Sequence, residues 1–397
     1  MLVLLDSLAT YFLASVAGIG FPVNAILPGL ILVMVARHGV SKMLPNTSTS
    51  IWVVLAIAGF SLGIAFNEEL GIDRFLKIGS AFSAFIIGYN VGYWGRNDKK
   101  LADYLLLVGL VYSLVCVLAL LKIAPGLFPI KEAMGFKEGN LVVRPEITID
   151  QNFQIYYLFF ICFIFTQSFS TIRYGLAGLA LLGALFTVVT LQTRSGTILL
   201  GLSFGLAVIY PVWMKSKGSV FRLLLVFTAF VLIVAIKLDD IQDIASGILD
   251  RFFNDDFHTF WGRVISATYL FEKIVNPVWW FPRGNSEFIA LYKDVPHFNP
   301  TAVFLEGGII ALAAWVALVL LPLFKGVAAV LKKKTDVFEA LIVVGAGITF
   351  VAGLTLNTPY YEHAWLWAGA LLGGLIKKKN SRRAALIHKR AQLRGEK

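Results

Sequence analysis

Long apolar runs separated by short polar turns constrain this chain more than any other feature. A helix needs about 20 apolar residues to cross a bilayer core, and it satisfies its own backbone hydrogen bonds there. Runs long enough to span a bilayer, or nearly so, begin near Leu2, Phe21, Ile51, Ile72, Leu101, Phe153, Tyr174, Thr197, Val220, Thr301, Val337 and Tyr361. The pattern predicts an all-α integral membrane protein, a single polytopic domain over residues 1–397 with about twelve transmembrane helices.

Composition supports this prediction. Hydrophobic residues make up 58% of the 397 residues and charged residues only 15%, whereas a soluble protein carries about 25% charged residues. We expect no cleaved signal, because the first apolar run lacks a preceding basic segment. Both cysteines, Cys116 and Cys162, fall inside apolar runs, so neither a disulfide framework nor a thiolate metal site is expected.

The basic residues indicate an orientation. Twelve spans place both termini on one side, which then receives 22 of the 35 Lys and Arg residues but only six of the 24 acidic residues. The positive-inside rule makes this side the cytoplasm. Orientation therefore accounts for the net charge of +11, and no nucleic-acid partner is expected. The basic tail, residues 377–397, is expected to lie on anionic membrane lipids.

The two long hydrophilic segments, residues 122–150 and 237–300, both fall on the outer side in this topology. Within the second, apolar residues recur on one helical face over residues 241–253, which predicts a short amphipathic helix. The inner loops are too short for a nucleotide-binding domain, and no Walker-type glycine loop occurs, so ATP is not expected as a partner. No internal repeat is visible, which weakens a transporter hypothesis.

Two arginines of the outer side are candidate site residues. Arg194 lies in the sequence LQTRSGT, a very short turn between two spans. It either closes a helical hairpin by snorkelling to the surface or holds a cation where a phosphate would lie. Arg263, in the sequence GRVISAT, opens a helical stretch whose residues Val264, Ile265, Ala267 and Leu270 are expected to pack inward. Arg263 either holds a cation for a phosphate, as proposed for Arg194, or is simply a solvated loop arginine.

Glu306 and His297 are the remaining outer-side candidates. Glu306 falls inside an apolar span, so it is either functional or paired with a nearby arginine. His297 immediately precedes Asn299-Pro300, which predicts an N-cap and a first-turn proline. The start of that helix disfavours an imidazolium and keeps the ring neutral, as a general base requires.

Together these residues suit one chemistry. The arginines can neutralise a diphosphate while the neutral histidine accepts a proton from an attacking hydroxyl. The chain contains neither an HExxH sequence nor a paired-carboxylate motif, and the aspartates near Asn254 are too few for a convincing metal site. We therefore expect no metal or other cofactor.

Three motifs, in order, resemble the O-antigen ligase/polymerase superfamily: TRSG at Thr193, GRVISAT at Gly262 and HFNPTAVFLEGG at His297. One departure is that Phe298 follows the histidine, where the family commonly has Asn or Ser. Arg144, in RPEITIDQN, faintly matches a family loop and is a weaker substrate-binding candidate alongside Glu306.

The resemblance implies a metal-independent glycosyltransferase of the bacterial inner membrane, with its active site facing the periplasm. An O-antigen ligase transfers a glycan from undecaprenyl diphosphate to lipid A–core. Arg194 and Arg263 would hold the diphosphate, and His297 would activate the acceptor hydroxyl, with inversion at the anomeric carbon. The alternatives are an O-antigen polymerase or a protein O-oligosaccharyltransferase of the same superfamily, and, in another class, a lipid-linked glycan transporter.

Overall fold

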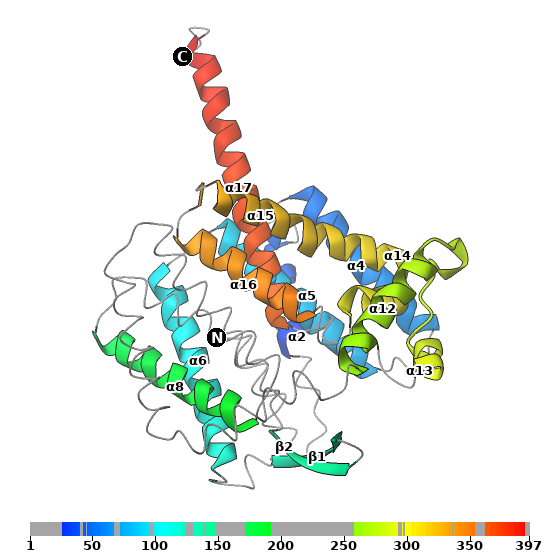
Figure 1. The fold of residues 1–397 in the computed structure, drawn as a ribbon. Coiled ribbons are helices and arrows are strands. Elements are labelled where there is room, and N and C mark those ends of the chain that lie inside the picture. Colours follow the sequence, from blue (N-terminus) through cyan, green and yellow to red (C-terminus); the bar gives the residue numbers. More distant parts are fainter. Residues whose placement is uncertain are drawn as a thin grey trace. The chain divides into compact units, whose positions relative to one another are not determined.

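The structure is a computed structural model (Figure 1). It describes residues 26–39, 43–44, 46–66, 72–94, 98–121, 123, 130–137, 140–147, 171–191, 258–292, 296, 298–332, 334–335, 337–353 and 362–393. These residues form helices and one two-stranded sheet. They fall into two compact units: one between Asp98 and Phe260, the other between Pro22 and Asn97 and between Trp261 and Lys397.

The first unit contains two long apolar helices and the sheet: α6 (Asp98–Leu120), α8 (Thr171–Leu191), β1 (Ile130–Lys137) and β2 (Asn140–Ile147). The strands pair antiparallel, with Ile130 opposite Ile147. This hairpin lies in the hydrophilic segment 122–150, where the sequence analysis predicted no strands, so the all-α prediction is correct for the helices and misses this element. A short connection that contains glycine separates the strands in sequence, as is common in hairpins.

The second unit is a helical bundle. Its elements are α2 (Ile26–His38), α4 (Thr47–Phe66), α5 (Ile72–Tyr93), α12 (His258–Ile274), η2 (Pro277–Trp279), α13 (Ser286–Tyr292), α14 (Asn299–Trp315), the π-helical turn η3 (Val316–Leu320), α15 (Leu321–Leu331), α16 (Val337–Gly353) and α17 (Glu362–Leu393). Buried aromatic side chains fill its core, with the Phe82 and Trp365 rings 5.0 Å apart.

The predicted apolar runs correspond to helices wherever the structure describes them. Helices begin close to eight of the twelve predicted starts, and the other four, near Leu2, Phe153, Thr197 and Val220, lie outside the described residues. So does the predicted amphipathic helix over residues 241–253. Two helices among the described residues, Thr47–Phe66 and Asn299–Leu331, are long and apolar enough to cross a membrane. The basic tail continues α17 as far as Leu393.

In two pairs of helices, glycines let the two members of the pair approach each other closely. In α5 and α17, Gly88 faces the backbone of Leu366, and Gly373 faces that of Tyr89. A methyl group at either glycine would overlap a backbone carbonyl of the partner helix. The small-xxx-small spacing lets backbones approach in this way. Because residue numbers rise together along the contact, α5 and α17 run parallel.

The other pair is α4 and α14. Gly59 lies against Gly307 and Ala311, and Gly63 lies against Glu306. The residue numbers run in opposite directions along this contact, so the two helices are antiparallel. The glycines of α4 therefore admit the backbone of α14 at the point where, as described below, its helical geometry is interrupted.

Polar contacts give the directions of two further helix pairs. In the first unit, Arg173 at the start of α8 forms an ion pair at 2.7 Å with Asp103, which lies near the start of α6. Further along both helices, the Ser113 hydroxyl of α6 donates to the Ala180 carbonyl of α8 at 2.7 Å. These helices are therefore parallel. In the second unit, Lys378 of α17 contacts Glu339 in the first turn of α16 at 2.8 Å, as expected for antiparallel neighbours.

Candidate functional site

Helix α14 is interrupted two turns from its start, at Glu306-Gly307-Gly308. Gly308 has φ 68° and ψ −170°, and helical geometry continues on both sides of it. These angles lie in a region that is essentially restricted to glycine. The regular hydrogen-bond ladder is lost across such a break, so the backbone groups there require partners from elsewhere.

These partners come from residues 280–285, between η2 and α13, which we call the strap. The carbonyl of Leu305 accepts hydrogen bonds from the N–H groups of Arg283 and Gly284, both at 2.9 Å. The N–H of Ile309 donates to the carbonyl of Trp280, the first strap residue, also at 2.9 Å. The strap thus replaces the missing ladder on both sides of the break.

A buried carboxylate lies beside this break. Glu306 is 1% exposed, and its Oε1 accepts a hydrogen bond at 2.7 Å from Nδ2 of Asn285, which is 8% exposed. Burying a carboxylate is costly unless it is hydrogen-bonded. This bond joins Glu306 to the amide at the end of the strap, and the pairing of Glu306 with an arginine stays a prediction. The strap is therefore fastened by a side chain as well as by its backbone.

Helix α12 packs against the first turn of α14. The hydroxyl of Thr301 donates to the carbonyl of Ser266 at 2.7 Å, and both residues are fully buried. Arg263 is half-buried and lies three residues before Ser266, so it belongs to the same side of α12. This contact holds the helix that carries Arg263 against the turn that directly follows His297 in the sequence.

The start of α14 differs from the prediction by one residue. Asn299 is the first helical residue and not the N-cap, which is Phe298, with φ −131° and ψ 109°. The Phe298 carbonyl accepts from the N–H of Thr301 at 2.9 Å, and no side chain caps the helix. Proline does lie in the first turn, as predicted. Asn299 is 6% exposed, so packing takes its side chain into the protein and away from a capping position.

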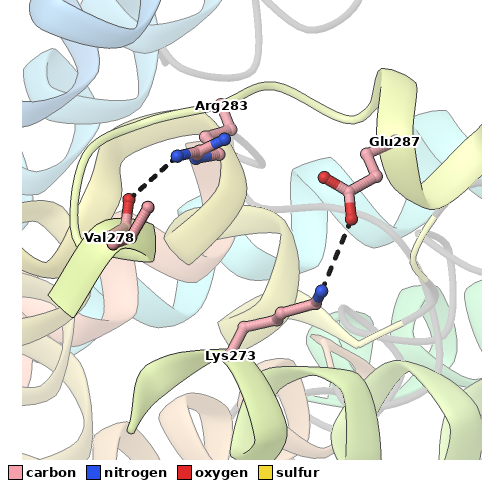
Figure 2. Close-up of polar contacts among 4 residues, drawn as sticks. All are labelled: Lys273, Val278, Arg283 and Glu287. Atoms are coloured by element: carbon pink, nitrogen blue, oxygen red, sulfur yellow. Dashed lines mark hydrogen bonds and ion pairs between the residues drawn. The ribbon is translucent and has the colours of Figure 1, made fainter. Parts of the chain in front are cut away.

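Two cationic side chains, Lys273 and Arg283, lie near the other end of α12 (Figure 2), and both contact an aromatic ring. The Lys273 ammonium lies 3.9 Å from the Trp279 ring centroid and 3.4 Å from a Glu287 oxygen. The Arg283 guanidinium lies 4.7 Å from the same ring and donates to the Val278 carbonyl at 3.1 Å. These cation–π contacts join α12, η2 and the strap.

Tyr269 lies under this cluster. It is 2% exposed, and its ring contacts those of Trp279 and Phe288 edge-on at 6.1 and 5.2 Å. Burial, and then the negative charge of Glu287, raise the pKa of the Tyr269 phenol well above its usual value. The phenol is therefore neutral at physiological pH and serves as a packing residue.

The structure locates some of the predicted site residues. Arg263 lies within α12, inside its second turn, and of its predicted inward-facing neighbours Leu270 is buried while Val264, Ile265 and Ala267 are half-buried. Glu306 is at the break of α14. Arg144 belongs to β2, in the first unit. Arg194 and His297 lie outside the described residues, so their predicted roles stay predictions.

Asn285 and the strap were not predicted as parts of the site. The sequence analysis interpreted the Gly-Asn pair at Gly284 as a turn, which is consistent with its φ of 71°. It did not link that turn to Gly307-Gly308, because the two stretches are more than 20 residues apart. The usable signal was the double glycine directly after an acidic residue inside an apolar run.

Comparisons with protein-family models, with curated proteins and with solved structures found no match for this chain.

Proposed function

We propose that the protein is a polytopic membrane glycosyltransferase that uses a lipid-diphosphate-linked glycan as donor. Within that class we propose an O-antigen ligase, which transfers the glycan from undecaprenyl diphosphate to lipid A–core on the periplasmic side of the bacterial inner membrane. An O-antigen polymerase or a protein O-oligosaccharyltransferase would use the same donor chemistry. The resemblance of the three motifs supports this choice of class.

We propose a twelve-span topology with both termini in the cytoplasm, and the relative directions of the described helices from α4 onward support its order of spans. In that topology α4 runs outward and α14 inward, and their packing is antiparallel. In the same topology both α5 and α17 run inward, and these two helices pack parallel to each other. It makes α6 and α8 both outward, and they too are parallel. An odd number of additional crossings between the two members of a pair would have reversed that pair.

The contact between Thr301 and Ser266 is the single observation that carries the proposed site. It holds Arg263 within a turn or so of the residues that follow His297 in sequence. The break in α14 lies just beyond, and interrupted helices in membrane proteins occur where backbone is buried in protein or lines a cavity. Arg263 therefore lies on a helix that contacts the first turn of α14, and that turn begins two residues after His297 in the sequence.

The proposed reaction is one direct displacement. The acceptor hydroxyl oxygen attacks the anomeric carbon of the donor glycan, and His297 takes the hydroxyl proton. The bond between the anomeric carbon and the phosphate oxygen breaks, and its electron pair leaves with the lipid diphosphate. Arg194 and Arg263 neutralise that leaving group, the task that a divalent metal performs in other enzymes. Arg144 and Glu306 are proposed to contribute to substrate binding.

Transfer by the purified protein tests this proposal. Donor and acceptor in detergent should give glycan-bearing acceptor in the presence of chelator, without added metal or ATP. Activity that disappears in chelator and returns with magnesium or manganese would contradict the arginine mechanism. In a deletion strain, lipopolysaccharide core without O-antigen and polymerised glycan on its carrier indicate a ligase, whereas core bearing one repeat unit indicates a polymerase. Wild-type lipopolysaccharide would contradict both.

A further inference from the structure

Five large apolar side chains project from the surface between the end of α12 and the strap. We call them the apolar rim: Phe271, Val275, Val278, Trp280 and Phe281, whose exposed fractions are 69%, 78%, 62%, 45% and 70%. They belong to the segment that the sequence analysis assigned to a hydrophilic outer loop. An exposed apolar patch of this kind marks a contact with a membrane or a partner.

One cation beside the rim has no carboxylate partner among the described residues. Lys273 is paired with Glu287. Among the described residues, the hydrogen bond of the Arg283 guanidinium goes to the Val278 carbonyl (Figure 2). The guanidinium also lies over the Trp279 ring. A guanidinium held in this way presents its remaining donors to solvent, and planar donors of this kind suit a phosphate group.

The rim is fixed to the outer ends of two apolar helices. The strap bonds to α14 at Leu305 and Ile309. A methyl group added at Gly63, one turn from the end of α4, would lie 3.5 Å from Pro282 of the strap. Among the described residues, α4 and the helix that begins with α14 are the two that are long and apolar enough to cross a membrane. The rim therefore has a defined depth relative to them.

We propose that the apolar rim inserts into the outer leaflet of the membrane, with Arg283 bound to the phosphate of a phospholipid. The inference rests on the topology within the proposed function, which puts these helix ends on the outer side. Tryptophan is enriched at membrane interfaces, and an arginine beside apolar side chains can bury its stem among them and hold its charged head at the headgroups. Insertion would hold α12, and with it Arg263, at the level where the diphosphate of a lipid carrier lies.

Spin labels report this depth directly. In a variant with Cys116 and Cys162 replaced by alanine, single cysteines are introduced by Phe281→Cys, by Val54→Cys on the exposed face of α4, and by Ser286→Cys at the exposed start of α13. The labelled full-length protein is placed in nanodiscs that contain anionic phospholipid. Collision rates with oxygen, which concentrates in lipid, and with a water-soluble nickel chelate are then compared.

Insertion predicts that the label at residue 281 is favoured by oxygen, like that at residue 54, and that the label at residue 286 is favoured by nickel. A nickel-favoured label at residue 281 with an oxygen-favoured label at residue 54 would overturn the rim proposal alone. A nickel-favoured label at residue 54 would instead contradict the membrane topology of the proposed function. A label at residue 281 that neither reagent reaches would mean that protein covers the rim, and would also overturn the proposal.

The phosphate contact has its own test in the same nanodiscs. Arg283→Gln removes the charge, and it should shift the label at residue 281 toward the nickel-favoured value. Arg283→Lys keeps the charge and should restore most of the original value, which separates charge from stacking on Trp279. An unchanged label in Arg283→Gln, or an equal shift in both variants, would overturn the assignment of Arg283 to a phosphate.

Discussion

At the residue scale, Arg263 and His297 are proposed to act on different substrates. Arg263 belongs to a helix held in place by a fully buried contact, and its charge is expected to meet the donor diphosphate. His297 is expected to meet the acceptor hydroxyl. A residue that binds donor before and during bond cleavage affects both binding and turnover, whereas a base affects turnover.

His297→Ala should lower transfer by about 10²–10⁴-fold and leave carrier-lipid binding nearly unchanged. Arg194→Ala or Arg263→Ala should weaken donor binding as well, with partial rescue by lysine, because an ammonium lacks the bidentate fork.

Transfer should also decline in acid as the imidazole of His297 gains a proton. Initial rates and donor titrations measure these effects. His297→Ala with more than about a tenth of wild-type turnover would place the base elsewhere.

The pair formed by Asn285 and Glu306 should be coupled energetically. Asn285→Ala leaves a buried carboxylate without its 2.7 Å donor, which should cost about 1–3 kcal/mol. Removing both partners should cost less than the sum of the two single changes, because no charge is then left without its donor. Thermal unfolding in detergent of the two single variants and the double alanine variant measures the coupling. Additive losses would mean that the two side chains act independently.

At the element scale, α14 depends on a backbone conformation that few residues adopt. Gly308→Ala should cost about 1–3 kcal/mol, because its φ of 68° with ψ −170° is strained for any residue with a Cβ. Gly175→Ala in α8 is the matched control. A methyl group there meets nothing within 4 Å, and the change should be neutral or stabilise by up to about 1 kcal/mol. Equal melting temperatures for both variants would argue against the break.

The crossing of α5 and α17 should be equally sensitive to added volume. Gly88→Ala or Gly369→Ala introduces a methyl group that overlaps a carbonyl of the other helix, and overpacking of this kind costs about 1–3 kcal/mol. Gly374→Ala, also in α17, adds a methyl group with nothing within 4 Å. It should melt like the wild type. If all three variants melt together, the two helices are further apart than described here.

At the scale of the whole molecule, the distribution of charge predicts the sidedness of labelling. A cysteine introduced by Ser286→Cys should react with an impermeant maleimide added to intact cells. One introduced by Ser381→Cys, in the basic end of α17, should react only after the inner membrane is opened. Both positions are exposed, so access alone does not distinguish them. The reverse pattern would invert the topology and move the proposed site to the cytoplasm.

Apolar runs were sufficient to predict the long helices, because a helix is the simplest way to satisfy backbone groups in an apolar setting. The same property concealed the break in α14, since Gly307-Gly308 interrupts no run. The partners of that break, the strap and Asn285, come from a distant stretch and are fixed by tertiary contacts. For the site, the sequence identified Arg263 and Glu306 as candidates, but only the structure shows that an amide binds the carboxylate.

The parallel contact between α5 and α17 has a consequence for synthesis. The two helices are separated by about two thirds of the chain, yet their backbones meet directly at four glycines. In the proposed membrane topology, α5 has no partner for that face while the ribosome is still translating, and it must wait in the membrane or be shielded there. The core of the second unit can close only when the last helix emerges. In the same topology, a chain cut short before Glu362 would leave the early helices inserted but unassembled, as a substrate for quality-control proteases.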